Sequence, residues 1–253
     1  MSLTRYGEIN ELLQQLLLQA QSILKNKFIG MYIGSSLAND SFHRETSDID
    51  CYIITTSVLS KDIDKKIEEM HNAFYSSKLQ YTQKIEVSYI PKKDLMSFDP
   101  GCMRPYFNEG RYYLATYGNN FLIELHVLRE KGITIIGPDI KGLIKEISIQ
   151  NLKSAILKNL QEYWGAALND PSKFTRSDYQ VFTILTMCRT IYSLETGAIT
   201  SKTEAAHWVI KKLDANWKNL IEEALTWVPG CEINKLEDTQ QFVRYVLNKC
   251  LDS

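Results

Sequence analysis

The chain has 253 residues, with 29 Lys and Arg against 30 Asp and Glu and a formal net charge of −1 at pH 7. A chain of this length can form one large domain or two modest ones, each with its own core. The near-neutral balance argues against a general nucleic-acid-binding protein, because such a protein needs a basic surface to neutralise phosphates. We therefore expect no nucleic acid among its partners.

The first part of the chain alternates between helical and strand-like patterns. The periodicity of apolar residues predicts a helix that ends near Lys25, a strand over 28–33 and a helix over 61–76. The apolar run 121–128 favours a further strand, and the passage 132–138 has the Gly and Pro residues typical of turns. This order predicts an α/β arrangement.

The rest of the chain has helical periodicity throughout. Gly197 is expected to end one helix, because glycine adopts the left-handed conformation, and Asp170-Pro171 is expected to interrupt another. We place the boundary between the two parts in the segment 146–151. The helices are predicted over 152–168, 179–195, 203–212, 217–227 and 239–250.

A Gly-Ser turn is followed closely by a pair of acids. The predicted strand 28–33 ends at Gly34-Ser35, where glycine lets the backbone approach a ligand and serine adds hydroxyl and amide donors for a phosphate. A second apolar strand opens with Asp48 and Asp50. Side chains alternate along a strand, so these two carboxylates point the same way and can bracket one cation.

A third acid, Glu86, lies in the alternating segment 84–90, on the face opposite its apolar neighbours. Three acids on neighbouring strands repel one another unless a cation or a shared proton relieves them. A lone pair of acids is typical of a solvated sheet edge. Their order after the Gly-Ser turn instead favours a metal-dependent enzyme that acts on a nucleotide.

Two basic residues of the helical part are candidates for phosphate contacts. Arg189 lies in a helix that is apolar almost all round, so we expect it to be partly buried and to need an anionic or hydrogen-bonding partner. Ser201 and Glu204 match a capping box, which places Lys202 in a first helical turn, where helix amides and a lysine favour an anion. A structural ion pair and a solvated lysine are the open alternatives.

These motifs resemble the DNA polymerase β-like nucleotidyltransferase superfamily, whose signature is Gly-Ser, a short helix and an acid-x-acid on the next strand. The segments 185–193, 196–199 and 201–208 resemble the helical domain of the aminoglycoside adenylyltransferases, which modify streptomycin and spectinomycin. The similarity covers nearly the whole chain.

The resemblance implies an α+β fold. An N-terminal nucleotidyltransferase domain (1–148), with a mixed sheet flanked by helices, would precede an all-helical domain (149–253) that closes the nucleotide and acceptor cleft. The implied reaction is magnesium-dependent transfer of AMP from ATP to a hydroxyl of a cationic antibiotic, with release of pyrophosphate. We expect a cytoplasmic, monomeric antibiotic-resistance enzyme.

The resemblance also assigns roles to residues of this chain. Asp48, Asp50 and Glu86 would hold Mg²⁺, and Glu86 would be the catalytic base, a metal ligand, or both. The nucleotide-binding residues would be Gly34, Ser35, Ser47, Arg189 and Lys202.

The acceptor pocket of a polycation should offer acids and aromatic faces, for which the candidates are Glu109, Tyr112, Tyr113 and Asp178. Streptomycin-modifying relatives carry a tryptophan after a Phe-Gly-Glu run, where this chain has Tyr112, and Asp178 is displaced by one position from the acid of their central helix. Streptomycin, spectinomycin or another hydroxyl compound therefore stays open as the acceptor. A lincosamide or protein-hydroxyl acceptor, and a nucleotide-binding relative without catalysis, are the alternatives.

The cysteines and the apolar segments fit this picture. The five cysteines form no Cys-x-x-Cys pair, which favours buried thiols over disulfides or a zinc site. No apolar segment is long enough for a signal peptide or a membrane span, so we expect no membrane partner.

Overall fold

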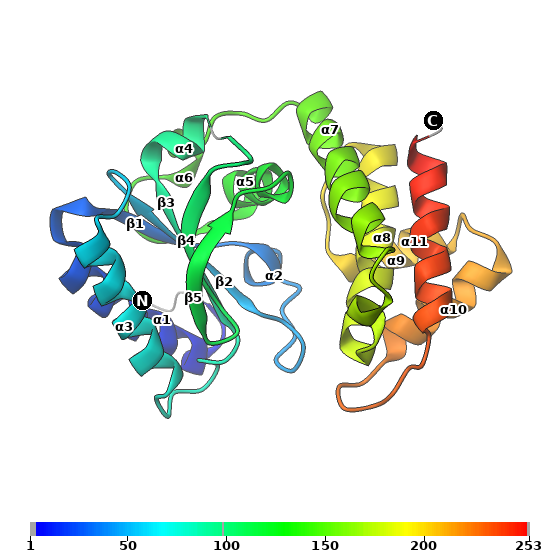
Figure 1. Cartoon of the computed structure of the whole chain (residues 1–253), viewed down its shortest axis with the longest axis horizontal. Helices are drawn as coiled ribbons and strands as arrows, with labels where there is room; N and C mark the ends of the chain where they lie inside the picture. Colours follow the sequence, from blue (N-terminus) through cyan, green and yellow to red (C-terminus); the bar gives the residue numbers. More distant parts are fainter. Residues whose placement is uncertain (1–3, 98, 252–253) are drawn as a thin grey trace. The chain divides into compact units, whose positions relative to one another are not determined.

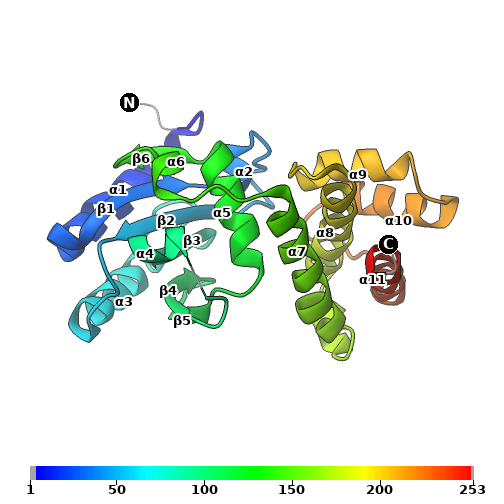
Figure 2. The same cartoon turned by 90° about the horizontal axis from the view of Figure 1, so that it is seen from above.

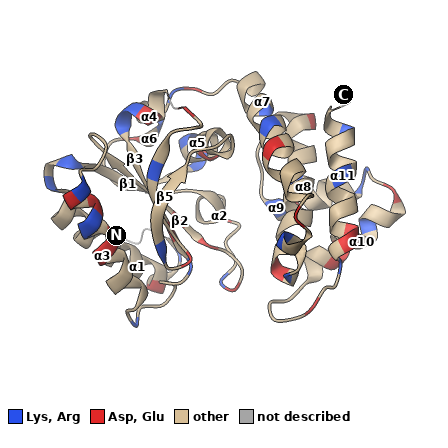
Figure 3. Cartoon of the chain, in the orientation of Figure 1, with Lys and Arg blue, Asp and Glu red and all other residues tan. Residues whose placement is uncertain are grey.

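The structure is a computed structural model that describes residues 4–97 and 99–251. The chain divides into two compact units, Met1–Glu146 and Ile147–Ser253, each with its own hydrophobic core (Figure 1). Acidic and basic residues are interspersed in both units (Figure 3). No helix of the described residues is both long and apolar enough to cross a membrane.

The first unit is built on a six-stranded sheet in the order β5-β4-β3-β2-β1-β6. Strands β2 and β3 are parallel and the other neighbours are antiparallel, which confirms the predicted mixed sheet. The strands are β1 (Phe28–Ile33), β2 (Ile49–Thr55), β3 (Ile85–Pro91), β4 (Met103–Asn108), β5 (Arg111–Thr116) and β6 (Ile133–Ile136).

Helices cover both faces of this sheet. The two long helices α1 and α3 pack side by side on one face, against alternate apolar residues such as Cys51, Ile53 and Val87 (Figure 1). Helices α2 and α5 lie on the other face, which therefore carries the intervening residues of β2 and β3. The helices of this unit are α1 (Gly7–Leu24), the 3₁₀ turn η1 (Lys25–Lys27), α2 (Ser35–Ala38), α3 (Lys61–Tyr75), α4 (Lys92–Met96), α5 (Asn120–Lys131) and α6 (Ile140–Leu143).

Two sequence predictions for this unit are wrong. The segment 121–128 is part of helix α5, because its buried residues Phe121, Leu125 and Leu128 recur at helical spacing and not at the period of a strand. The passage 132–138 contains strand β6, which pairs with β1 at the edge of the sheet.

The second unit is entirely helical, as predicted. Helix α8 lies at its centre and packs against α9, α10 and α11 (Figure 2). Its apolar residues meet Phe242 and Val246 of α11 in the core. The elements are α7 (Ile149–Asn159), the π-helical turn η2 (Leu160–Gly165), the 3₁₀ turn η3 (Pro171–Phe174), α8 (Ser177–Thr196), α9 (Lys202–Ile210), α10 (Ala215–Thr226) and α11 (Leu236–Leu251).

The prediction of buried thiols holds only in part. Cys51 in β2 and Cys188 in α8 are buried, and Cys250 is half-buried. Cys102 and Cys231 are exposed, because both lie in connections between elements, where no layer covers them. All five cysteines are free thiols.

Gly197 ends α8 in the left-handed conformation, with φ 75°, as its sequence position predicts. A Cβ at this position would lie 3.1 Å from Cγ2 of Ile149. We expect Gly197→Ala to lower the free energy of unfolding by about 1 to 2 kcal/mol, because a side chain is strained in this conformation. Urea denaturation would measure the change. Gly165→Ala is the matched control, since a Cβ there meets only ordinary contacts; an equal loss in both variants would contradict this account.

Candidate active site

The three predicted acids come together on one face of the sheet. Asp48 directly precedes β2, Asp50 is the second residue of β2, and Glu86 is the second residue of β3. In the parallel register Asp50 lies opposite Glu86, so the two side chains share a face. Asp48 is exposed, whereas Asp50 and Glu86 are half-buried.

The electrostatics of the cluster act mainly on Glu86. Burial is the largest cause that raises the pKa of Glu86 to about 8; the negative charges of Asp50, Asp48 and Glu124 act in the same direction, and a hydrogen bond from Tyr106 acts against them. Desolvation and like charges both disfavour the ionised carboxylate. At neutral pH this site therefore has affinity for either a proton or a cation.

The donor set fits a magnesium ion that a nucleotide helps to bind. Among the described residues, no group of three or more His, Cys, Asp or Glu side chains is arranged so that it could hold a metal ion. Mg²⁺ does not require one, because it usually takes one or two carboxylates and completes its shell with water and substrate phosphates. The carboxylates of Asp48 and Asp50 would be those ligands.

The Gly-Ser turn is bonded directly to the strand that carries the acids. The Gly34 amide donates to the carbonyl oxygen of Asp50 at 3.0 Å, and the Ser36 hydroxyl donates to the carbonyl oxygen of Asp48 at 3.4 Å. A Cβ on Gly34 would lie 2.8 Å from Cε2 of Tyr52, so only glycine fits beside that ring. Ser35, with φ 49°, then begins α2. The predicted phosphate turn thus adjoins the acids.

Ser47 lies in the same loop, immediately before Asp48. Its hydroxyl accepts a hydrogen bond from the backbone amide of His43 at 3.0 Å. The contact fixes the loop that leads into β2, next to the acid pair.

Three residues near the acids were not predicted from the sequence, namely Arg104, Tyr106 and Glu124. Tyr106 donates a hydrogen bond from its hydroxyl to Oε2 of Glu86. Arg104 is buried and forms an ion pair with Glu124, at 3.6 Å between Nη2 and Oε2. The helical spacing of buried residues in α5 was the signal that could have revealed Glu124.

The structure does not bring Tyr112 to the acids, which corrects its assignment as an acceptor contact. Its register partner in β4 is Phe107, a core residue on the face of α1 and α3. The Tyr112 hydroxyl donates to Oδ1 of Asp64 in α3, at 2.6 Å. Tyr113, paired with Tyr106, lies on the face of Glu86 instead. Consecutive residues of a strand point to opposite faces of the sheet, so Tyr112 and Tyr113 lie on different faces.

Glu109 lies in the tight turn between β4 and β5, where Asn108 pairs with Arg111. Its carboxylate is exposed, and its φ of 49° together with φ 74° at Gly110 closes a two-residue hairpin. Glu109 therefore has a structural role in the turn, and its side chain is accessible to solvent.

The remaining predicted residues belong to the second unit. Arg189 is half-buried in α8, as predicted. Lys202 is the first residue of α9, where the predicted capping box of Ser201 and Glu204 is present. The Lys202 ammonium lies 4.3 Å from the centroid of the Phe182 ring, a cation–π contact.

Asp178 lies in the first turn of α8 and binds the side chain of Arg176. Hydrogen bonding to that guanidinium lowers the pKa of Asp178, which therefore carries a negative charge at neutral pH. An exposed carboxylate of this kind is suited to a cationic group of a ligand.

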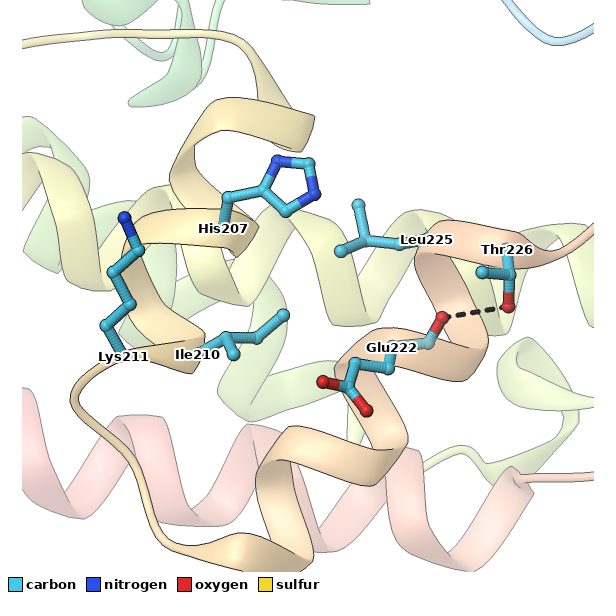
Figure 4. A pocket seen from close by; sticks show the side chains of 6 residues that line it. All are labelled: His207, Ile210, Lys211, Glu222, Leu225 and Thr226. Atoms are coloured by element: carbon cyan, nitrogen blue, oxygen red, sulfur yellow. Dashed lines mark hydrogen bonds between the residues drawn. The ribbon is translucent and has the colours of Figure 1, made fainter.

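A hollow in the second unit lies apart from these residues. Figure 4 shows it between α9 and α10, with the side chains of His207 and Leu225 facing each other across it. None of the predicted site residues lines it; its lining is His207, Ile210, Lys211, Glu222, Leu225 and Thr226.

The first unit thus combines a mixed sheet, a glycine-serine turn bonded to an acid pair, and a third acid opposite that pair on the next parallel strand. This arrangement of turn and acids is the one that the resemblance to the nucleotidyltransferases predicts.

Comparisons with known proteins find similarity to adenylyltransferases. A family model described as the C-terminal domain of aminoglycoside adenylyltransferase matches residues 142–253. A spectinomycin 9-adenylyltransferase of Campylobacter jejuni is 28% identical over 228 residues, which is 86% of this chain and 84% of the relative. An aminoglycoside (3'') (9) adenylyltransferase of Escherichia coli is 30% identical over 141 residues, which is 54% of this chain and 51% of the relative.

A solved structure shares the fold. The crystal structure of spectinomycin adenyltransferase AAD(9) from Enterococcus faecialis with ATP and spectinomycin matches with a TM-score of 0.76 at 20% identity, over 96% of this chain and 99% of that one. The helical part of the chain is thus similar to the C-terminal domain of aminoglycoside adenylyltransferases, and the curated relatives that match over most of the chain are spectinomycin 9-adenylyltransferases.

The raised pKa of Glu86 has a consequence for stability. Because the folded-state pKa of about 8 lies above the ordinary 4.5, the folded state binds more protons between these values, and stability falls as pH rises through them. We compare the variant Glu86→Gln with the wild type in magnesium-free buffer. We expect the gain in the free energy of unfolding to be larger at pH 8.5 than at pH 5, by at least about 1 kcal/mol. Thermal unfolding at both pH values would measure it. Glu11→Gln, at an exposed position of α1, is the control; a stabilisation that does not depend on pH would argue against the raised pKa.

Proposed function

We propose that this chain transfers AMP from ATP to a hydroxyl of an aminoglycoside-type antibiotic, spectinomycin and/or streptomycin, and releases pyrophosphate. The observation that carries the proposal is the register of Asp50 opposite Glu86, which sets the Asp50 carboxylate beside a carboxylate of raised pKa. The names of the relatives, which include spectinomycin 9-adenylyltransferases, support spectinomycin as the first acceptor to test. We further propose a cytoplasmic, monomeric enzyme.

Glu86 is the general base of the proposed reaction. The acceptor oxygen attacks the α-phosphorus of ATP, its proton passes to Glu86, and the bond from the α-phosphorus to the bridging oxygen of pyrophosphate breaks. A base is most effective when its pKa lies near the working pH, and burial has raised the pKa of Glu86 into that range. Glu86 could also complete the magnesium shell.

Asp48 and Asp50 would hold magnesium on the triphosphate. When bound, the ion would supply positive charge that offsets the negative charge of the phosphate oxygens as pyrophosphate leaves. The backbone turn at Gly34 and Ser35 would contact the phosphates, with Ser47 fixing the adjoining loop.

Two cations of the second unit would add positive charge to the triphosphate. Lys202, at the first turn of α9, and Arg189, half-buried in α8, are the proposed contacts. A phosphate would complement both the lysine at a helix N-terminus and the half-buried guanidinium by its negative charge.

A cationic acceptor would meet acids and an aromatic face. We propose Glu109 and Tyr113 of the first unit and Asp178 of the second unit as its contacts. Glu109 and Asp178 offer carboxylates to its ammonium groups, and Tyr113 is 43% exposed on the face of Glu86.

Pyrophosphate release from magnesium-ATP tests the proposal, with spectinomycin, streptomycin, other aminoglycosides and lincosamides as acceptors. We expect stimulation by spectinomycin or streptomycin, and a loss of about 10²- to 10⁴-fold in Glu86→Gln, because the acceptor proton then lacks its base. Asp50→Asn should lose activity together with magnesium dependence. Asp62→Asn removes an exposed carboxylate from α3, on the other face of the sheet, and should leave the rate unchanged.

Two results would count against the proposal. If no acceptor stimulates pyrophosphate release while ATP still binds, the acceptor is of another class or the chain lacks catalytic activity. Full activity of Glu86→Gln would remove the proposed base.

A further inference from the structure

The Glu86 carboxylate accepts a hydrogen bond from Tyr106, a residue that no sequence pattern singles out. Tyr106 lies in β4, where it pairs with Ser88 of β3, two residues beyond Glu86. Both side chains therefore project from the same face of the sheet. The Tyr106 hydroxyl donates to Oε2 of Glu86.

We propose that Tyr106 is a positioning residue for Glu86, and that Arg104 acts through Tyr106 by fixing its ring. The proposal rests on the proposed role of Glu86 as the base. Because Oε2 accepts the tyrosine hydroxyl, the carboxylate is held in one orientation and Oε1 is the atom that receives the acceptor proton. A base that can rotate would spend part of its time misaligned with that proton.

Arg104 is anchored far more firmly than a surface arginine. It is only 5% exposed, and it lies two residues before Tyr106 on the same face of β4. Its Nε donates to the Ser88 hydroxyl at 3.2 Å, and its Nη1 donates to the carbonyl oxygen of Thr116 at 3.4 Å. The ion pair with Glu124 of α5 adds a third anchor. These contacts use the fork geometry of a guanidinium, which a lysine cannot reproduce.

The Arg104 guanidinium lies over one face of the Tyr106 ring. Its central carbon lies 5.5 Å from the Tyr106 ring centroid, and the Tyr113 ring meets Tyr106 edge-on at 5.7 Å. The same guanidinium lies 4.8 Å from the rings of Tyr117 and Phe121, so its own position is fixed by aromatic faces as well. The Tyr106 ring therefore has neighbours on two sides, and its hydroxyl is directed at Glu86.

The chain of contacts runs from helix α5 through Glu124, Arg104 and Tyr106 to Glu86. Each link is a hydrogen bond, an ion pair or a cation–π contact. Glu124 also repels Glu86 electrostatically, and Arg104 offsets the charge of Glu124 by its own. Arg104 thus orients Tyr106 and also offsets the negative charge of Glu124.

The test is steady-state kinetics of Tyr106→Phe with ATP and the acceptor identified by the pyrophosphate assay. We expect kcat to fall about 10- to 100-fold, because the base loses its alignment, while KM for both substrates stays within about two-fold. Tyr117→Phe is the matched control: it removes a hydroxyl that donates to Asp94, from a ring beside the same guanidinium, and should leave kcat unchanged.

Arg104→Lys tests the second part of the proposal. Alone it should lower kcat without raising KM, and combined with Tyr106→Phe it should add no further loss, since Arg104 acts through the tyrosine. Should the buried lysine prevent folding, Tyr106→Phe by itself still decides the first part.

An unchanged kcat in Tyr106→Phe, or an effect on KM alone, would overturn the positioning role. If Glu86→Gln is inactive and Tyr106→Phe is fully active, the proposed function stands and only the positioning role of Tyr106 is wrong. Fully active Glu86→Gln would instead remove the base itself.

Discussion

The repulsion between carboxylates at the start of two parallel strands is the constraint on which the site depends. Parallel pairing sets Asp50 opposite Glu86, and burial removes much of the water that would screen them. Such an arrangement costs stability, which the apolar residues on the opposite face of the same strands offset by packing against α1 and α3. The folded chain thus maintains a cluster of acids whose mutual repulsion a bound cation would reduce.

The neighbouring elements limit the freedom of this cluster. The Gly34 amide bonds the carbonyl oxygen of Asp50, so the turn that precedes α2 and the strand β2 are connected directly. Tyr106 holds one oxygen of Glu86, and Arg104 holds the ring of Tyr106. Fixed groups of this kind favour reactions in which positioning and charge, more than covalent chemistry, lower the barrier.

Simple periodicities predicted the parts of the site that local rules determine. Alternation along β2 and β3 placed Asp50 and Glu86 on the polar face, and the capping box placed Lys202 in the first turn of α9. The run 121–128 was misassigned because a short apolar segment fits a strand and a buried helix equally well. That error concealed Glu124 and, with it, the partner of Arg104.

Tertiary contacts decided the rest, which no local pattern contains. The β4–β5 register sets Tyr113, and not Tyr112, on the side of Glu86, and a difference of one residue reverses the face. The burial of Arg104 depends on residues from β3, β5 and α5 that lie far apart in the sequence. Roles for such residues follow only from the folded structure.

Mass spectrometry of spectinomycin after incubation with the protein, ATP and magnesium would detect the proposed adenylyl transfer. We expect the antibiotic to gain one adenylyl group with the wild-type protein and to stay unmodified with Glu86→Gln. Spectinomycin that stays unmodified with the folded wild-type protein, while streptomycin also stays unmodified, would contradict the assignment.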